Sequence, residues 1–306
     1  MQIVTALGMV CRKFLSPQSA AYRALAAFYQ RLDSLKRQYA RNSITVAVNV
    51  TQHCNLNCAC CNQFSPLVDE YFYPVETFQN ECGRLLAVGK QKISMIGFQG
   101  GEPLLHPRLA EFFDIARTYF DKYNPAGRIS MISNGLLLLR QPESFWRNCK
   151  KNNVIINITN YRIRLDYNAM EMTAKKYGVQ FEYIEDSGII EKTTNRMPFD
   201  TAGTQDVKTT WRLCYYANKC INLREGKLYA CPTVQGVQFF NSYFGTHLEI
   251  SEKDSIDIFK AKNIDEILDF LSKPVPFCRY CNWKAAQTQI PWRTSTKSIS
   301  EWADTP

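Results

Sequence analysis

The sequence predicts an α/β protein built around a parallel β-sheet, on three observations. Short β-branched runs alternate with amphipathic stretches between residues 44 and 185, which is typical of βαβ units. The chain has 306 residues, 45% hydrophobic and 21% charged, a size and composition that suit one large domain, or one large domain with an appendage. No apolar run reaches the ~18–20 residues of a membrane span, so a transmembrane helix is excluded.

The elements follow from local periodicity. The expected strands are Ile44–Val50, Ile93–Gln99, Ile129–Ser133, Val154–Thr159 and Gln180–Glu185. The helices expected between them are Val75–Val88, Pro107–Tyr119, Phe145–Lys151 and Tyr167–Tyr177. Further on, the sequence predicts a hairpin over Cys220–Cys231 that turns near Glu225-Gly226, and a helix over Ile264–Leu271.

The amino-terminal segment carries most of the net charge. Residues 1–43 hold seven Lys and Arg against one Asp, so they supply +6 of the total of +9. Pro17 to Arg41 has helical periodicity, and this basic helix either packs on the body or touches a membrane surface or a partner. The remaining +3 is too little for a polyanion-binding surface, so we expect no nucleic-acid partner.

Twelve cysteines are the first chemical lead. Arg12 and Lys13 follow the apolar start of the chain instead of preceding it, which argues against a secretory signal. We therefore expect a cytoplasmic protein, whose cysteines in a reducing compartment bind metal more readily than they form disulfides.

Three cysteines follow the first strand with C-x3-C-x2-C spacing: Cys54, Cys58 and Cys61. Three soft thiolates on one loop suit an iron–sulfur cluster and leave one iron of a cubane without a protein ligand. The alternative is a zinc knuckle completed by His53, which is poorly placed to converge on the same ion as Cys54. Cys60 is a possible competing ligand with less suitable spacing.

This motif resembles that of the radical S-adenosylmethionine (SAM) superfamily, over roughly residues 44–186. The resemblance implies a partial (β/α)6 TIM-like barrel, a 4Fe–4S cluster on the three cysteines, and SAM bound at the open iron. Cys60 stands where the family usually has an aromatic residue near the adenine, so only its backbone contacts are expected here.

Three further motifs match SAM-binding positions of the family. Gly100-Gly101-Glu102-Pro103 would hold the methionine amino group, because glycine admits close backbone approach and a carboxylate pairs with an ammonium. Ser133-Asn134 would lie near the methionine carboxylate or the ribose, and Thr159 occupies a position where a polar residue commonly meets SAM. All of these residues end predicted strands, the edge that forms the active site in parallel α/β barrels.

A second cysteine group comprises Cys214, Cys231, Cys278 and Cys281. It resembles the twitch (half-SPASM) auxiliary domain, an α+β domain that implies a second 4Fe–4S cluster, with Cys220 as an alternative to Cys214. The alternative to a cluster is a structural zinc site. The expected divisions are 1–43, a barrel over 44–210, a twitch-like domain over 211–285 and a tail over 286–306.

The resemblance also implies the chemistry. A flavodoxin- or ferredoxin-type donor would reduce the first cluster, SAM would be cleaved to a 5′-deoxyadenosyl radical, and the radical would take hydrogen from substrate. The short segment before the barrel favours a small molecule, such as a sugar or cyclitol, undergoing oxidation or a related transformation. A peptide-modifying maturase and a non-enzymatic zinc protein are the alternatives. Asp200, Glu185 and Asp186 are candidate bases.

Overall fold

The computed structural model describes residues 43–304 except 160, 162, 164, 185–192, 215 and 218. Residues 42–306 form one compact unit. The expected basic helix over Pro17 to Arg41 lies outside the described residues.

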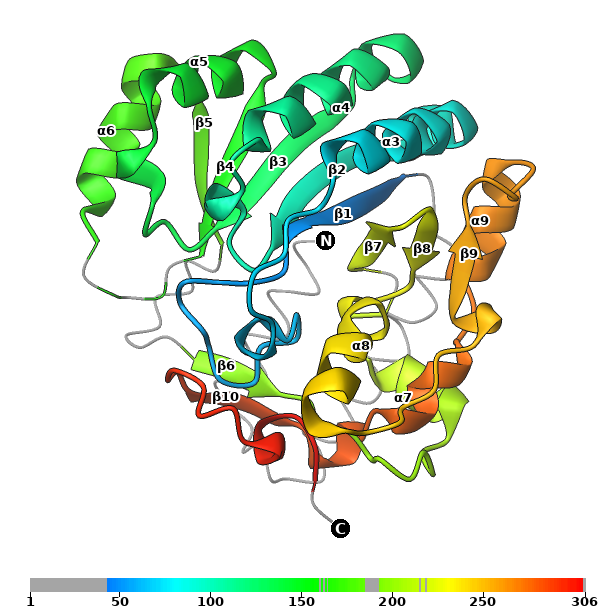
Figure 1. The fold of residues 1–306 in the computed structure, drawn as a ribbon. Coiled ribbons are helices and arrows are strands. Elements are labelled where there is room, and N and C mark those ends of the chain that lie inside the picture. Colours follow the sequence, from blue (N-terminus) through cyan, green and yellow to red (C-terminus); the bar gives the residue numbers. More distant parts are fainter. Residues whose placement is uncertain are drawn as a thin grey trace, which may run out of the picture. The chain divides into compact units, whose positions relative to one another are not determined.

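An eight-stranded sheet organises this unit, in the order β5-β4-β3-β2-β1-β7-β8-β9 (Figure 1). Strands β1 to β5 are parallel to one another, and β7 pairs parallel with β1. Strand β8 pairs antiparallel with both of its neighbours, β7 and β9. Their bounds are β1 Ile44–Thr51, β2 Ile93–Gly100, β3 Arg128–Ser133, β4 Val154–Thr159, β5 Gln180–Ile184, β7 Ile221–Arg224, β8 Lys227–Tyr229 and β9 Ser255–Asp257.

The expected (β/α)6 order is corrected in one respect. Five parallel strands follow in sequence within the described residues, and the sixth parallel strand, β7, lies beside β1 instead of beside β5. The reason is that β7 belongs to a hairpin, with β8 running back antiparallel beside it. The second half of the chain thus extends the sheet from its first strand.

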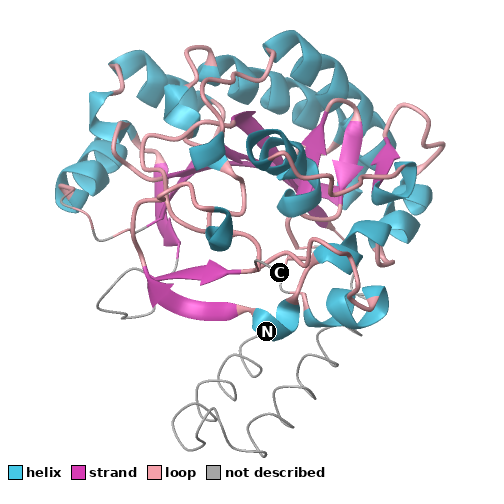
Figure 2. Ribbon diagram, turned by 60° about the horizontal axis from the view of Figure 1, so that its bottom comes forward, coloured by secondary structure: helices cyan, strands magenta, loops and turns pink. Residues whose placement is uncertain are grey.

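Four helices connect the parallel strands: α3 Val75–Gly89, α4 Leu109–Tyr123, α5 Glu143–Lys151 and α6 Tyr167–Tyr177. Their buried side chains and alternate strand residues such as Val46, Val48 and Val50 form one hydrophobic core. Burial of this helix-facing side leaves the odd-numbered positions of β1, Ala47 and Asn49, on the opposite face. Figure 2 shows the helices outside the strands.

A second hydrophobic core joins segments distant in sequence. It contains Phe64, Phe199, Phe240 and Trp302, contributed by the cysteine loop, a mid-chain loop, helix α8 and the carboxyl end. The remaining elements are α7 Val207–Leu213, α8 Pro232–Phe244, α9 Ile264–Leu271 and a two-stranded sheet of β6 Thr193–Arg196 and β10 Gln287–Pro291. Among the described residues, no helix has the length and apolar character needed to cross a membrane.

Candidate active site

A cavity of about 220 Å³ lies at the carboxyl ends of the parallel strands. Residues predicted from four separate motifs line it: Cys54, Cys58, Cys61, Gly100, Gly101, Ser133, Asn134 and Thr159. Parallel strands end at one edge of a sheet, which is why motifs up to a hundred residues apart converge here. Gln63, Ser65, Gln99, Tyr161, Cys220 and Pro232 also line the cavity.

The three-cysteine loop presents its thiols to this cavity while Cys60 does not line it. Burial first, and then Glu102 and Cys61, raise the pKa of Cys54 to about 12. Cys60 has a positive φ of 57° and is 9% exposed, and its thiol lies near Glu301 and Arg293. One ring nitrogen of His53 faces away from the thiols towards another segment, because its Nδ1 accepts a hydrogen bond of 3.1 Å from the backbone N–H of Tyr71.

Glycine is required where the loop after β2 crosses the start of the cysteine loop. A Cβ at Gly101 would lie 1.8 Å from the carbonyl oxygen of His53, and one at Gly100, with φ +132°, 2.0 Å from that of Thr51. Backbone hydrogen bonds from Gly101 to Thr51 and from Glu102 to His53, both 3.1 Å, complete the crossing. The two glycines therefore hold the cysteine loop against β2 as well as lining the cavity.

Glu102 differs from the expectation of a direct contact with SAM. Its side chain is fully buried, and its carboxylate accepts hydrogen bonds from the Ser133 hydroxyl and the Asn134 backbone N–H, both 2.8 Å, and from the Leu104 N–H at 3.0 Å. Burial raises its pKa to about 7 against these three donors. Glu102 thus joins the end of β2 to the end of β3 from behind the cavity.

Asn134 connects the end of β3 to the cysteine loop through its side chain. Its Nδ2 donates to Asn55 Oδ1 at 2.7 Å and lies 3.7 Å from Cys54 Sγ. Glu102 thus holds the backbone of Asn134, and the Asn134 side chain contacts Asn55 and the first cysteine. Ser133 reinforces the turn, since its Oγ accepts a hydrogen bond from the Gly135 N–H at 3.0 Å.

Tyr161 is a cavity residue that sequence reasoning missed. It follows β4 and lies near all three thiols; burial, and then Cys58, Cys61 and Cys54, raise its pKa well above the ordinary range. Its ring meets Trp292 edge-on, with centroids 6.2 Å apart. Its position two residues after Thr159, at the carboxyl end of a strand, was the feature of the sequence that could have indicated a site residue.

The carboxyl-terminal segment holds the cysteine loop in place. Cys58 forms an isolated antiparallel bridge with Thr294, and the Ala59 N–H donates to Arg293 O at 2.9 Å. Trp302 Nε1 donates to the carbonyl of Cys61 at 2.8 Å. Segments about 240 residues apart in sequence are thereby joined at the site.

Cys214, Cys231, Cys278 and Cys281 are brought together in a second place. Burial first, and then the thiols of Cys231, Cys214 and Cys278, raise the pKa of Cys281 well above its usual range. Cys220 lines the first cavity, and of the four thiols of this group only Cys214 acts on its pKa. This placement favours Cys214 over Cys220 as the fourth member of the group.

A buried carboxylate orders the loop that carries Cys278. Asp254, which is 0% exposed, accepts hydrogen bonds from the Phe277 N–H at 2.6 Å and from Ser251 N–H and Oγ, both 2.7 Å. Phe277 and Cys278 lie in the short 3-10 helix Pro276–Tyr280. Asp254 therefore connects this helix to the segment before β9.

Of the three proposed bases the structure describes Asp200, which does not line the cavity. Asp200 holds its own loop, accepting from the Thr204 hydroxyl at 2.6 Å and Gln205 Nε2 at 2.9 Å, and these bonds lower its pKa to about 2. Glu185 and Asp186 lie outside the described residues. Cys82 and Cys149 are fully buried in the core, as their helical positions predict.

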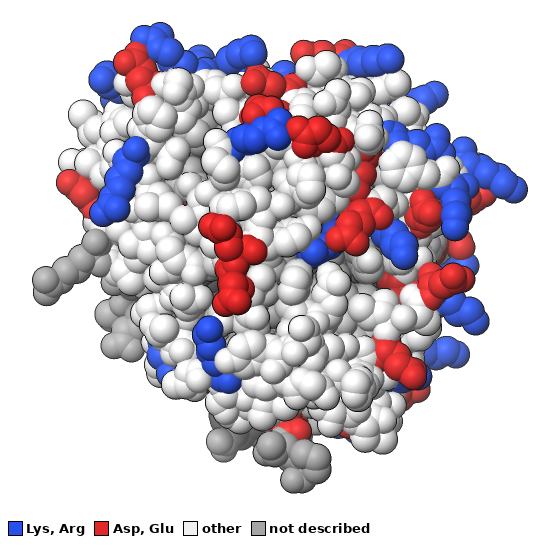
Figure 3. All heavy atoms as spheres, in the orientation of Figure 1, with Lys and Arg blue, Asp and Glu red and all other residues white. Residues whose placement is uncertain are grey.

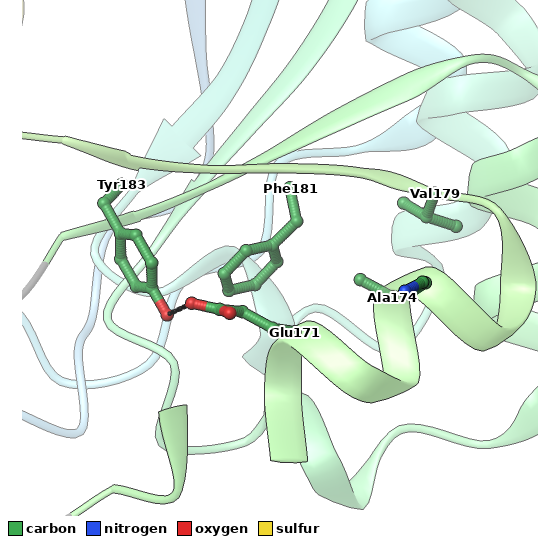
Figure 4. A pocket seen from close by; sticks show the side chains of 6 residues that line it. Glu171, Ala174, Val179, Phe181 and Tyr183 are labelled. Atoms are coloured by element: carbon green, nitrogen blue, oxygen red, sulfur yellow. Dashed lines mark hydrogen bonds between the residues drawn. The ribbon is translucent and has the colours of Figure 1, made fainter. Parts of the chain in front are cut away.

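A second, more open hollow lies between α6 and β5 (Figure 4). Tyr183 in this hollow donates to Glu171 Oε1 at 2.6 Å, and the sequence motifs contribute no described residue to the lining of the hollow.

On the face shown in Figure 3, Lys and Arg are interspersed with Asp and Glu. In the part of the chain that the structure describes, no three His, Cys, Asp or Glu side chains lie close enough to hold one metal ion.

The first site fits a cluster with SAM by its chemistry. Three thiol sulfurs share a cavity with glycine backbone, a hydroxyl and an amide, and soft thiolates are the ligands of iron–sulfur clusters.

Comparison with known proteins agrees with this donor set. Residues 48–189 match the family model of the Radical SAM superfamily, so this part of the chain is similar to radical SAM domains. The match includes the three-cysteine loop and every strand end that lines the cavity from β1 to β4, and it ends before Cys214.

Individual relatives are more distant. The chain is 35% identical over 109 residues to the GTP 3′,8-cyclase of Chlorobaculum tepidum, a match that spans 35% of this chain and 30% of that protein. Among solved structures, BtrN in complex with AdoMet and 2-DOIA is similar, with 15% identity, a TM-score of 0.45, and 78% of this chain and 93% of that chain covered. Native anSMEcpe with bound AdoMet and the Cp18Cys peptide gives 21% identity, a TM-score of 0.36, and 46% and 42% coverage.

Proposed function

We propose that this protein is a radical SAM oxidoreductase that acts on a small molecule of the sugar or cyclitol kind. The observation that carries the proposal is the convergence of three thiols, two glycines, Ser133, Asn134 and Thr159 on one cavity. When bound, a 4Fe–4S cluster and SAM supply a 5′-deoxyadenosyl radical that takes a hydrogen atom from substrate. Cys54, Cys58 and Cys61 would hold the cluster.

The chain's own residues orient the cofactor and shield it. Gly100 and Gly101 present backbone at the cavity wall, and Asn134 and Thr159 present an amide and a hydroxyl. Glu102 fixes Asn134 from behind, and the carboxyl-terminal segment covers the back of the cysteine loop through Trp302. These contacts support a preorganised cofactor site.

A second 4Fe–4S cluster on Cys214, Cys231, Cys278 and Cys281 is part of the proposal. Four thiolates saturate a cluster, so its part would be electron transfer and structure instead of SAM binding. The mutual effects of these thiols on one another's pKa support the grouping. A cytoplasmic flavodoxin- or ferredoxin-type protein would supply electrons.

Two adjacent cysteines provide the test of the first cluster. After anaerobic reconstitution we expect about eight irons and eight sulfides per chain, and 5′-deoxyadenosine after addition of SAM and dithionite. Cys61→Ala should abolish cleavage, whereas its neighbour Cys60→Ala should retain it, because Cys60 does not line the cavity. Zinc without iron in anaerobically purified protein would support the structural zinc alternative.

A second pair tests the auxiliary group. Cys214→Ala should lower the iron content towards half, whereas Cys220→Ala should leave it unchanged, because Cys220 lines the other cavity. A Cys278→Ala/Cys281→Ala variant should still cleave SAM but form little oxidised product. Full, coupled product formation in that variant would remove the support for an electron-accepting role.

A further inference from the structure

Hydrogen-bond donors point at the sulfur atoms of the three-cysteine loop. Cys54 Sγ accepts a hydrogen bond from the backbone N–H of Leu56 at 3.4 Å, and Asn134 Nδ2 lies 3.7 Å from the same sulfur. Cys58 shares a hydrogen bond with the side chain of Tyr161. The two donors at Cys54 are amides, whereas the donor at Cys58 is a phenol hydroxyl. Tyr161 therefore directs a hydroxyl at one of the three thiols that would hold the cluster.

Two chain segments fix the position of Tyr161. It follows the end of β4 by two residues and lines the cavity together with all three thiols. Its ring contacts Trp292 edge-on, with centroids 6.2 Å apart. Trp292 directly precedes residues 293–295, whose backbone hydrogen-bonds to Ala59 and Asn57 of the cysteine loop at 2.9 and 2.7 Å. The segment that holds the cysteine loop thus also holds the tyrosine ring.

The hydroxyl of Tyr161 lies away from water and among the thiols. Burial is the first cause that raises its pKa well above the ordinary range, followed by Cys58, Cys61 and Cys54. A hydrogen bond is stronger in such surroundings than in water, and stronger again when its acceptor is charged. Because the ordinary pKa of tyrosine is already about 10, the oxygen keeps its proton near neutral pH. The hydroxyl therefore donates and the sulfur of Cys58 accepts.

We propose that Tyr161 raises the reduction potential of the first cluster by donating this hydrogen bond to the Cys58 sulfur, an inference that rests on the proposed function. Reduction adds one electron from the flavodoxin- or ferredoxin-type donor, makes or breaks no covalent bond and moves no proton. The added negative charge reaches the cysteine sulfurs, so the hydrogen bond is stronger in the reduced state than in the oxidised state. Hydrogen bonds to sulfur are among the factors that set cluster potentials. Tyr161 thus acts through Cys58, as a positioning residue.

Tyr161→Phe tests this role, because it removes the hydroxyl and keeps the ring that contacts Trp292. The potential of the first cluster should become more negative: at a fixed potential the ratio of reduced to oxidised cluster should fall about tenfold, which is ~59 mV for one electron. The loss of one hydrogen bond to a charged acceptor is an effect of this size. Tyr183→Phe, which removes a hydroxyl that donates to Glu171 at 2.6 Å, is the matched control and should keep the wild-type potential.

The measurement is a redox titration of the anaerobically reconstituted protein, followed by electron paramagnetic resonance (EPR). Addition of SAM changes the signal of the cluster with an open iron, which identifies the first cluster. The second cluster, saturated by four thiolates, should keep its potential in both variants. An unchanged or less negative potential of the first cluster in Tyr161→Phe would overturn the inference. An equal shift of both clusters would also overturn it, because it would show a general change of structure, and so would weaker SAM binding at an unchanged potential.

A second measurement needs no substitution. Pulsed EPR of wild-type protein that carries ring-deuterated tyrosine should detect deuterons coupled to the reduced first cluster, because Tyr161 lines the cavity beside the three thiols. Their absence would overturn the inference even if Tyr161→Phe failed to fold.

Iron content and 5′-deoxyadenosine formation, measured on the same preparations, separate this inference from the proposed function. Protein that loads iron and cleaves SAM, with one and the same first-cluster potential in wild type and Tyr161→Phe, refutes the role of Tyr161 alone. Protein that binds zinc and no iron refutes the radical SAM proposal and this inference with it.

Discussion

At the residue scale, Glu102 shows how a motif residue can act behind a site. The resemblance led us to expect its carboxylate at the SAM ammonium, yet three protein donors occupy that carboxylate in a fully buried position. The motif predicted where Glu102 lies in the chain. Its partners could not be predicted, because Ser133 and Asn134 reach it only through the pairing of β2 with β3.

Glu102→Gln should change both cofactor binding and the pH dependence of stability. In the Gln variant the side-chain NH2 faces the Asn134 backbone N–H, so two donors oppose each other and this hydrogen bond is lost. SAM affinity should therefore fall, whereas the amount of iron bound should not change. In the wild type, burial raises the pKa to about 7 from the ordinary 4.5, so the ionised form is disfavoured in the folded state. The free energy of unfolding should therefore fall as pH rises from about 4.5 to 7, by on the order of 3 kcal/mol.

Urea unfolding of the metal-free protein at several pH values measures this effect. The Gln variant should lack this part of the pH dependence, because it has no carboxyl group to ionise. If the free energy of unfolding changes with pH equally in the two proteins, Glu102 does not titrate in this range. If the Gln variant binds SAM as tightly as the wild type, Glu102 has no positioning role.

Asp254 orders the Cys278 loop in a similar way. Asp254→Asn replaces one acceptor oxygen by a donor facing backbone and hydroxyl donors, which should destabilise the protein by about 1–3 kcal/mol. Reconstitution of the second cluster should be slower. The exposed neighbour Glu252→Gln is the control, and thermal melting with iron assays is the measurement. An Asn variant that melts and loads iron like this control contradicts the role.

At the element scale, local patterns predicted what local interactions determine. Strand β4 and helix α6 have the expected bounds, and α6 begins at an Asp166 side chain that caps Ala169 N and ends at Gly178 in the left-handed conformation. Helix α8 was missed, although Pro232 at its first turn and Gly245 after its end are ordinary boundary signals. The pairing of residues 293–302 with the cysteine loop had no local signal, because it joins segments far apart in sequence.

This pairing makes a prediction for the carboxyl-terminal segment. Trp302→Phe removes the Nε1–H that binds the Cys61 carbonyl and should cost about 1 kcal/mol while keeping the aromatic packing. The first cluster should then lose iron to a chelator faster than in the wild type. Trp146→Phe, a core residue of α5, is the control. Equal rates of iron loss in both variants would show that the segment does not hold the loop.

At the scale of the whole unit, β7 and β8 continue the sheet that β1 to β5 begin. The four cysteines of the second group flank this extension: Cys214 precedes β7, Cys231 follows β8, and Cys278 and Cys281 follow α9. Because β1 pairs with β2 on one side and with β7 on the other, the two halves share their backbone hydrogen bonds. We therefore expect them to unfold together.

Loss of the second cluster should destabilise both halves. Metal binding stabilises the folded state, so Cys278→Ala/Cys281→Ala should lower the melting temperature in one cooperative transition. Hydrogen exchange should speed up in β3 as well as in β8, because both exchange through global unfolding. Cys220→Ala, which leaves the four-cysteine group intact, should melt and exchange like the wild type. Fast exchange confined to β8, with β3 still protected, would mean that the cysteine-rich segment unfolds as a separate domain despite the shared sheet.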